Sequence, residues 1–239
     1  MVVKKIIALV ILILFPFQSF AFSLGLVSDI HADSYKKRNI GKYNVTYPKR
    51  ANSYFKKALT EMKNKGVELV IITGDITNRG QKKYYLKLKK TASNSKMKII
   101  WIRGNHDSKH FNQLNAERFY FFDFKDSWRV ICLDSSVALG NSTGQLDASQ
   151  INFLKEKSDT ERNIIIAMHH PPISKTDFKP LKNYADFWKA VNEKENIRLI
   201  ATGHWHSSFN EKINGKDVTI TDALTNQKKL NYAIKKLDN

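Results

Sequence analysis

Residues 98–107 read KIIWIRGNHD, and this stretch decides how the rest of the chain is interpreted. An apolar run, Ile99–Ile102, ends abruptly in the polar and glycine residues 103–107. A β-branched run that gives way to glycine and to side chains able to bind metals indicates a buried strand with a site at its carboxyl end.

Four other apolar runs end in the same way. They are Leu24–Val27, which precedes Asp29 and His31; Leu69–Ile72, which precedes Asp75; Ile164–Met168, which precedes His169 and His170; and Ile197–Ala201, which precedes His204 and His206. Five buried strands are therefore expected to end in Asp, Asn or His. Segments with the apolar spacing of a helix lie between several of these strands. Such alternation of strand and helix predicts largely parallel strand pairing in an α/β fold, with helices covering the sheet.

The segments between these runs carry local signals of their own. We expect helices over 51–62, 81–92, 108–118, 147–158 and 184–191, a strand over 128–133 and a hairpin around Asn214 and Gly215. Asp147 and Gln150 have the spacing of a capping box. The polar segment Asp33–Lys49 predicts a long loop that serves as a substrate lid, and the tail beyond Gln227 has helical spacing.

The first 21 residues resemble a secretory signal. Lys4 and Lys5 precede an apolar run that is too short to span a bilayer, and a small residue, Ala21, stands at the expected cleavage point. We therefore expect a periplasmic or secreted protein in which residues 22–239 form one domain, with no membrane span left after cleavage. A retained N-terminal anchor is the alternative.

The chain is strongly basic, with a formal net charge of +18, and it has a single cysteine. Positive charge favours anionic partners such as phosphate esters, nucleic acid or acidic membrane surfaces. Lysines on the solvated faces of helices would give the same composition, and the sequence lacks the interleaved aromatic and basic residues of a stacking groove for nucleic acid. Cys132 lies in an apolar run and is expected to be buried rather than nucleophilic.

The polar residues that follow the strands suit divalent metals. Seven donors, namely Asp29, His31, Asp75, Asn105, His169, His204 and His206, exceed what a single tetrahedral ion needs and fit two ions that share a carboxylate. The two pairs with a spacing of two residues would present both side chains on one face of an extended segment. Carboxylate, imidazole and amide donors without thiolate favour manganese, iron or zinc, and two such ions can clamp the oxygens of a phosphoryl transfer.

These motifs resemble those of the calcineurin-like metallophosphoesterases. The matching residues are Asp29-x-His31, Gly74-Asp75, Gly104-Asn105-His106-Asp107, His169 with His170-Pro171-Pro172, and Gly203-His204-x-His206. The His-His-Pro-Pro form looks most like the branch of class III cyclic-nucleotide phosphodiesterases and bacterial glycerophosphodiesterases. The resemblance implies a four-layer α/β (α+β) fold, in which two packed mixed sheets are flanked by helices.

The resemblance also implies the roles of the site residues. One ion would be held by Asp29, His31, Asp75 and His206, and the other by Asp75, Asn105, His169 and His204, so that Asp75 bridges them. His170 would lie behind the ligands. A hydroxide bridging the metals would attack phosphorus, His106 would act as the acid or stabilise the transition state, and Asp107 would orient the His106 imidazole or raise its pKa.

We therefore expect an exported, dinuclear metal-dependent phosphodiesterase that acts on a small phosphoester. The enzymatic alternatives are a phosphomonoesterase and a nuclease, for which nucleic acid would be the substrate. The alternative of another class is a metal-binding scaffold without turnover. The sequence leaves the natural substrate, the metal and the oligomeric state open.

Overall fold

A computed structural model describes residues 21–40, 44–107, 109–173 and 180–238 of the chain. Two sheets form its centre, one of four strands in the order β12-β1-β4-β5 and one of six in the order β10-β11-β9-β8-β7-β6. In the first sheet β1, β4 and β5 run parallel and β12 is antiparallel to β1. In the second, β11, β9, β8 and β7 run parallel, and antiparallel β10 and β6 form the edges.

The strands and helices have the following bounds. The strands are β1 (Phe22–Val27), β2 (Arg38–Ile40), β3 (Asn44–Thr46), β4 (Val67–Ile72), β5 (Lys98–Trp101), β6 (Tyr120–Phe124), β7 (Trp128–Cys132), β8 (Asn163–Ala167), β9 (Ile197–Thr202), β10 (Phe209–Ile213), β11 (Lys216–Ile220) and β12 (Ala233–Leu237). The α-helices are α1 (Ala51–Asn64), α2 (Lys82–Ser95), α3 (Ala148–Lys157) and α4 (Tyr184–Val191), and the 3-10 helices are η1 (Pro48–Arg50), η2 (Lys109–Leu114) and η3 (Asn226–Lys228).

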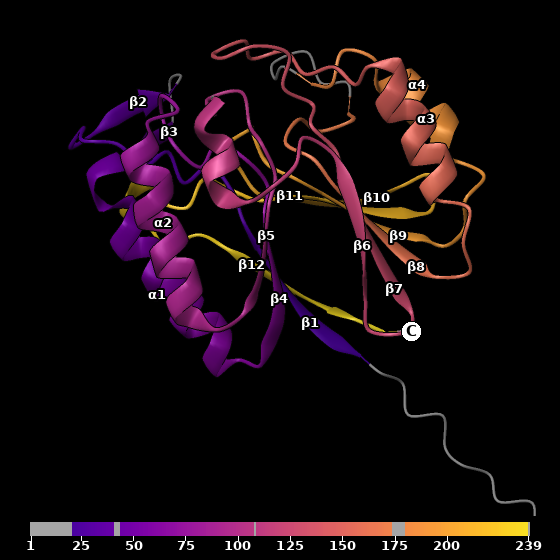
Figure 1. Cartoon of the computed structure of the whole chain (residues 1–239), viewed down its shortest axis with the longest axis horizontal. Helices are drawn as coiled ribbons and strands as arrows, with labels where there is room; N and C mark the ends of the chain where they lie inside the picture. Colours follow the sequence, from indigo (N-terminus) through magenta and orange to yellow (C-terminus); the bar gives the residue numbers. More distant parts are fainter. Residues whose placement is uncertain (1–20, 41–43, 108, 174–179, 239) are drawn as a thin grey trace, which may run out of the picture.

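The elements stack in four layers, as the family resemblance implied. Figure 1 shows α1 and α2 on the outer side of the first sheet and α3 and α4 on the outer side of the second. Between the sheets, alternate residues of their strands form a buried apolar layer that includes Leu26, Ile71, Ile100, Val130 and Ile165. Two further apolar clusters pack the helices onto the outer faces, so both faces of each central strand are buried.

Two local expectations are wrong, and a third is confirmed only in part. The segment Asp33–Lys49 is not a plain loop, because β2 and β3 pair within it as an antiparallel hairpin. The tail is not helical: β12 pairs with β1 and satisfies the backbone groups of what would otherwise be an edge strand. The expected helix over 108–118 is the shorter 3-10 helix η2.

The capping box at α3 is only half formed. The Asp147 side chain accepts a hydrogen bond from the Gln150 backbone amide, as a helix N-cap does. The Gln150 side chain does not return to the cap, however, and instead bonds both the backbone N–H and the carbonyl oxygen of Asp134, at 2.8 Å and 2.9 Å. Gln150 is fully buried and links α3 to the loop after β7.

Cys132 is buried as expected, and burial raises the pKa of its thiol to about 12. Within the described part of the chain, none of the helices has the length and apolar character needed to cross a bilayer. The proposed signal, residues 1–21, lies almost entirely outside the described residues.

Candidate metal centre

Polar residues that follow five parallel strands converge at one place. The loop after β1 supplies Asp29 and His31, the loop after β4 supplies Asp75, and the loop after β5 supplies Asn105 and His106. From the second sheet, the loop after β8 supplies His169 and His170, and the loop after β9 supplies His204 and His206. The first two loops are joined by backbone hydrogen bonds, from Asp29 to Gly74 at 3.1 Å and from His31 to Asp75 at 2.8 Å.

Five of these residues have a left-handed backbone. Their φ angles are 49° at Asp29, 48° at His31, 50° at Asp75, 72° at His204 and 50° at His206. Residues other than glycine rarely adopt such angles. The residues that do adopt them cluster at functional sites, where a strained backbone is part of the arrangement. The expectation of two extended segments is therefore wrong, although Asp29 and His31 still face one group of donors. His204 and His206 instead point to different groups of donors.

The first group consists of Asp29, His31 and His206. Asp29 Oδ1 lies 3.0 Å from His206 Nε2 and 3.6 Å from His31 Nε2, and the two imidazole nitrogens are 3.0 Å apart. This carboxylate oxygen is buried and has no hydrogen-bond partner among residues 21–40, 44–107, 109–173 and 180–238. Three donor atoms facing one point, one of them an unpartnered buried oxygen, fit a divalent cation.

The second group contains Asn105, His169 and His204. His169 Nε2 lies 3.1 Å from Asn105 Oδ1 and 3.2 Å from His204 Nδ1, and His169 Nδ1 lies 2.8 Å from the carbonyl oxygen of Thr73. A carbonyl oxygen only accepts, so the His169 Nδ1–H donates a hydrogen bond to it. The Nε2 atom is then the one that can bind a metal in the second group.

Asp75 lies between the two groups. Its Oδ2 is 3.6 Å from His31 Nε2 and 3.5 Å from His169 Nε2. Its Oδ1 accepts a hydrogen bond of 2.8 Å from the backbone amide of His106. One oxygen thus faces both groups while the other is fixed by the backbone, which is the arrangement that a shared carboxylate requires.

The electrostatics of the site also suit cations. Burial lowers the pKa of His31 to about 4 and that of His204 to about 3, so both imidazoles stay neutral and keep a lone pair. Burial would also lower the pKa of His169, but the Asp75 carboxylate outweighs it and raises that pKa to about 9. Asp75 therefore favours positive charge beside it, which a bound divalent ion would supply.

His106 and Asp107 do not contact each other in the way that the sequence suggested. His106 Nδ1 lies 2.9 Å from the carbonyl oxygen of Asn78, whereas the Asp107 carboxylate accepts from the backbone amides of Gly104, Ile76 and Thr77 at 3.0 to 3.2 Å. The Tyr85 hydroxyl also donates to Asp107, at 2.8 Å. The expectation that Asp107 orients the imidazole is therefore corrected: Asn78 holds the ring, and Asp107 holds the loop that carries it.

His170 lies beside the second group. Its ring centroid is 4.4 Å from that of His204, and its Nδ1 is 2.8 Å from the Ser135 hydroxyl. The His170, His169 and His204 donor atoms all lie within 4.8 Å of one another, so proximity alone does not separate ligand from neighbour. His169, which also faces Asp75, is the better placed to be a ligand.

Comparison with known proteins now decides the family. A family model described as calcineurin-like phosphoesterase matches residues 22–208, a range that contains every donor named above. The chain is a calcineurin-like phosphoesterase. The family and fold expected from the motifs are thus confirmed.

This phosphoesterase has relatives among bacterial proteins. It is 27% identical over 176 residues to the 3',5'-cyclic adenosine monophosphate phosphodiesterase CpdA of Haemophilus influenzae, a match that covers 68% of this chain and 63% of that protein. It is 25% identical over 203 residues to a 3',5'-cyclic-nucleotide phosphodiesterase of Nostoc sp., covering 80% of this chain and 74% of that protein. A dimetal phosphatase of Danio rerio shares the fold, with a TM-score of 0.76 at 13% identity over 90% of this chain and 92% of that one.

Several residues that shape the site were not found from the sequence. Asn78 acts through its backbone carbonyl, which any residue type offers, so no side-chain signal could have identified it. Tyr85 lies within the expected helix over 81–92, where its ring is fully buried and its hydroxyl donates to Asp107. Arg38 lies in the segment expected to be a loop, and it lines a cavity beside His106.

Proposed function

We propose that this protein is a dinuclear metal-dependent phosphodiesterase. The position of Asp75 Oδ2, 3.6 Å from His31 and 3.5 Å from His169, is the observation that carries the proposal, because it fits one carboxylate shared by two ions. The first ion would be held by Asp29, His31, Asp75 and His206. The second would be held by Asp75, Asn105, His169 and His204. Manganese, iron and zinc all suit these donors.

The chain's own residues divide the remaining work. Bound divalent ions would polarise the phosphoryl group and lower the pKa of the attacking water. His106, fixed by Asn78 through Nδ1, presents Nε2 to the cavity and would deliver a proton to the departing oxygen. Asp107 keeps the loop in place through three backbone amides, so that Asn105 and His106 stay aligned.

A diester rather than a monoester is supported by the relatives. The Haemophilus and Nostoc proteins are named as a cyclic adenosine monophosphate phosphodiesterase and a cyclic-nucleotide phosphodiesterase. We therefore place cyclic nucleotides among the candidate substrates. Export is a further proposal, which rests on the N-terminal sequence alone. Fractionation of cells would show where the protein is found, and its mass would show whether residues 1–21 have been removed.

Hydrolysis of matched aryl esters tests the function. Residues 22–239, reloaded with manganese, should hydrolyse bis-p-nitrophenyl phosphate faster than p-nitrophenyl phosphate, and a chelator should abolish the activity. Cyclic AMP and glycerophosphodiesters would then be screened. A preference for the monoester would instead indicate a phosphatase, and a metal-loaded protein inert to every ester would indicate a scaffold.

A further inference from the structure

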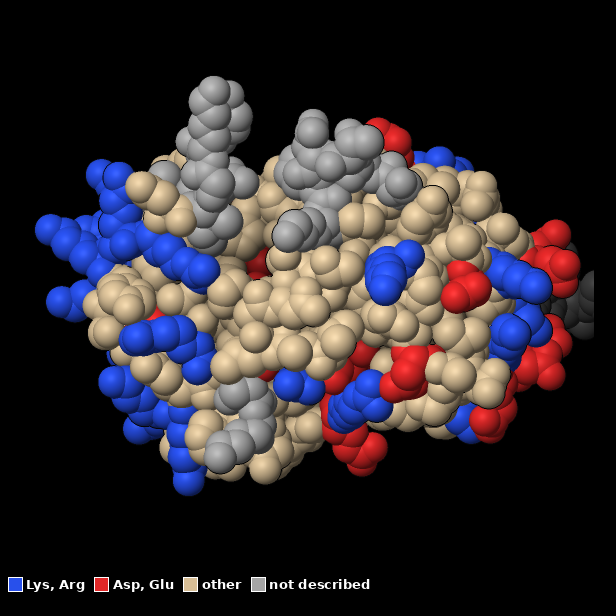
Figure 2. All heavy atoms as spheres, turned by 90° about the horizontal axis from the view of Figure 1, so that it is seen from above, with Lys and Arg blue, Asp and Glu red and all other residues tan. Residues whose placement is uncertain are grey.

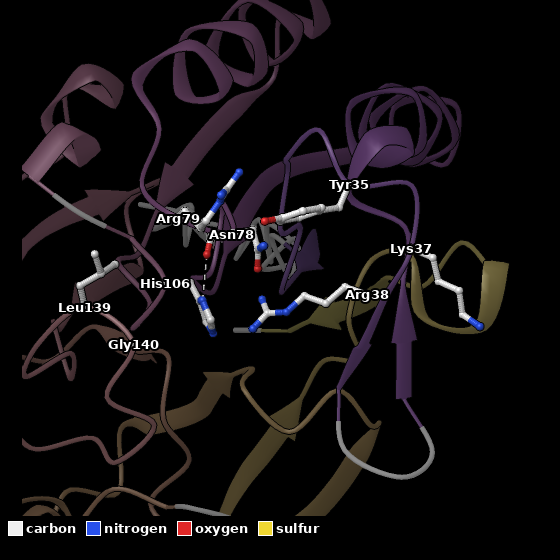
Figure 3. Close-up of a pocket in the computed structure, with 8 residues that line it drawn as sticks. All are labelled: Tyr35, Lys37, Arg38, Asn78, Arg79, His106, Leu139 and Gly140. Atoms are coloured by element: carbon white, nitrogen blue, oxygen red, sulfur yellow. Dashed lines mark hydrogen bonds between the residues drawn. The ribbon is translucent and has the colours of Figure 1, made fainter.

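A cavity of about 610 Å³ lies beside His106. Figure 3 shows residues that line it, among them Tyr35, Arg38, Arg79 and Leu139. Its lining includes Arg38, Arg79 and Lys37, and none of the described residues that line it is Asp or Glu. His106 lines it but none of the seven candidate metal donors does, so this cavity lies on the proton-donor side of the site.

Arg38 is the unusual residue of this cavity. Its side chain extends from β2 toward His106 (Figure 3), and its Nη1 is buried without a hydrogen-bond partner in the part of the chain that the structure describes. Among the described residues, no carboxylate oxygen lies within 4.0 Å of its guanidinium. A guanidinium nitrogen that is removed from water without a partner is unfavourable, and an anion bound in the cavity would relieve that cost.

The other cations of the cavity are differently placed. Arg79 donates to both oxygens of Asp33, at 2.9 Å and 3.0 Å, and its guanidinium carbon lies 4.7 Å from the Tyr35 ring centroid. Its charge is therefore already balanced, and its position is fixed. Lys37 points away from the cavity in Figure 3. Arg38 is thus the cation available to a ligand.

Positive charge continues beyond this cavity. An adjoining cavity of about 810 Å³ shares Arg79 and Leu139 with it and is also lined by Lys82, Lys83 and Arg103. The two lysines occupy the first turn of α2, which has no acidic residue, although the positive end of a helix dipole disfavours cations. Figure 2 shows Lys and Arg gathered at the end of the molecule that α1, α2 and β2 form.

We propose that the substrate carries a second phosphate on its leaving-group side and that Arg38 binds this phosphate. The proposal rests on the proposed phosphodiesterase function. The scissile phosphodiester has one negative charge, which the metal centre would balance. The positive charge of Arg38 in the cavity beside His106 would then have no counterpart on the substrate. Two kinds of substrate carry a second phosphate on the leaving group: a nucleotide with an additional phosphate, and a short single strand of nucleic acid.

Three thymidine dinucleotides separate the two sides of the scissile bond. TpT has only the scissile phosphodiester, and pTpT and TpTp add a phosphate at the 5' or the 3' end. Chromatography of the products of TpT shows which oxygen departs: release of thymidine 3'-phosphate means that the 3' nucleoside leaves, and release of thymidine 5'-phosphate means that the 5' nucleoside leaves. With manganese at constant ionic strength, the dinucleotide whose extra phosphate lies on the leaving nucleoside should have a kcat/KM about tenfold above that of TpT. The other should be within about twofold of TpT.

Substitution assigns the effect to Arg38. Arg38→Gln should bring the tenfold ratio close to one, mainly through KM, and Arg38→Lys should keep part of it. Lys90→Gln, an equal loss of charge on an exposed position of α2, should leave both the ratio and the activity on TpT unchanged. Competitive inhibition gives a second readout: thymidine 3',5'-bisphosphate should inhibit more strongly than thymidine 5'-phosphate, and only Arg38 substitution should remove the difference.

The outcomes separate the two proposals. A ratio of one in the unsubstituted protein, or equal losses on TpT and on the phosphorylated dinucleotide in Arg38→Gln, would overturn the second phosphate but leave the phosphodiesterase intact. No hydrolysis of any diester would overturn both. If the ratio holds, an eight-thymidine strand distinguishes the sources: a further gain in kcat/KM indicates a strand, and no gain indicates a nucleotide.

Discussion

His106 Nδ1 lies 2.9 Å from the main-chain carbonyl oxygen of Asn78, and this contact fixes which ring nitrogen faces the substrate. A carbonyl oxygen only accepts, so Nδ1 carries a hydrogen in every protonation state of the ring. Nε2 therefore holds a proton only when the imidazole is cationic. His106 must be in that form if it is to protonate a departing oxygen.

His106→Ala should reveal this role through the leaving group. We expect kcat to fall about 10²–10⁴-fold for a diester with an alkyl leaving group, and less than about tenfold for a p-nitrophenyl leaving group, which needs no proton. Metal content measured by mass spectrometry should not change. Equal losses on both substrates would show that His106 binds the phosphoryl oxygens rather than donating a proton.

The two groups of donors predict different metal stoichiometries. Asn105→Ala should reduce the metal content to about one ion per chain, since Asn105 faces only the second group. Asp75→Asn should weaken both sites, because Asp75 Oδ2 faces both His31 and His169. Elemental analysis after dialysis measures this. A full complement of metal in Asp75→Asn would rule out the shared carboxylate.

Gly104 leaves no room for a side chain. A Cβ at this position would collide with the backbone nitrogen and the carboxylate of Asp75. Gly104→Ala should therefore displace Asp75, reduce metal affinity and destabilise the fold by about 1–3 kcal/mol. Gly66→Ala is the control, because Gly66 has a φ of 72° but a Cβ added there would meet no described atom within 4 Å. It should cost some stability and leave metal binding unchanged.

Metal removal should lower thermal stability. Asp29 and Asp75 are both buried and lie close together beside His169. Bound cations would balance the negative charges of the two carboxylates. Metal at 100 to 1,000 times its Kd should stabilise the fold by about 3–4 kcal/mol, or about 5–15 °C in Tm, relative to protein in chelator. Calorimetry measures the shift, and Asp75→Asn should show much less of it. The same Tm with and without metal would contradict a folded-state metal site.

Gln150 should contribute more to stability than its surface neighbours. Gln150→Ala would leave the buried backbone N–H and carbonyl of Asp134 without partners, at an expected cost of about 2–4 kcal/mol. Gln145→Ala, at an exposed position nearby, should change stability by less than about 0.5 kcal/mol. Urea unfolding compares the two. Similar effects would mean that solvent satisfies Asp134 in the variant.

The metal centre could be predicted from the sequence because its residues follow apolar strands. Buried parallel strands are continuous apolar runs, and the polar residues at their ends are therefore conspicuous. The prediction of secondary structure failed in the C-terminal tail, where the local sequence pattern was ambiguous. Leu230, Ala233 and Ile234 have helical spacing, yet β12 forms because β1 offers it an unpaired edge.

The sequence by itself determined which donors are present, in which order, and at the ends of which strands. The family resemblance implied how they divide, and the tertiary structure gives the physical basis: the left-handed backbone at His204 and His206 sends these side chains to different groups. The tertiary structure alone decided that Asn78, not Asp107, holds His106, and that Arg38 Nη1 finds no hydrogen-bond partner among the described residues. The physical reason is that such contacts depend on backbone groups and on loops from distant parts of the chain, whose approach no local pattern encodes.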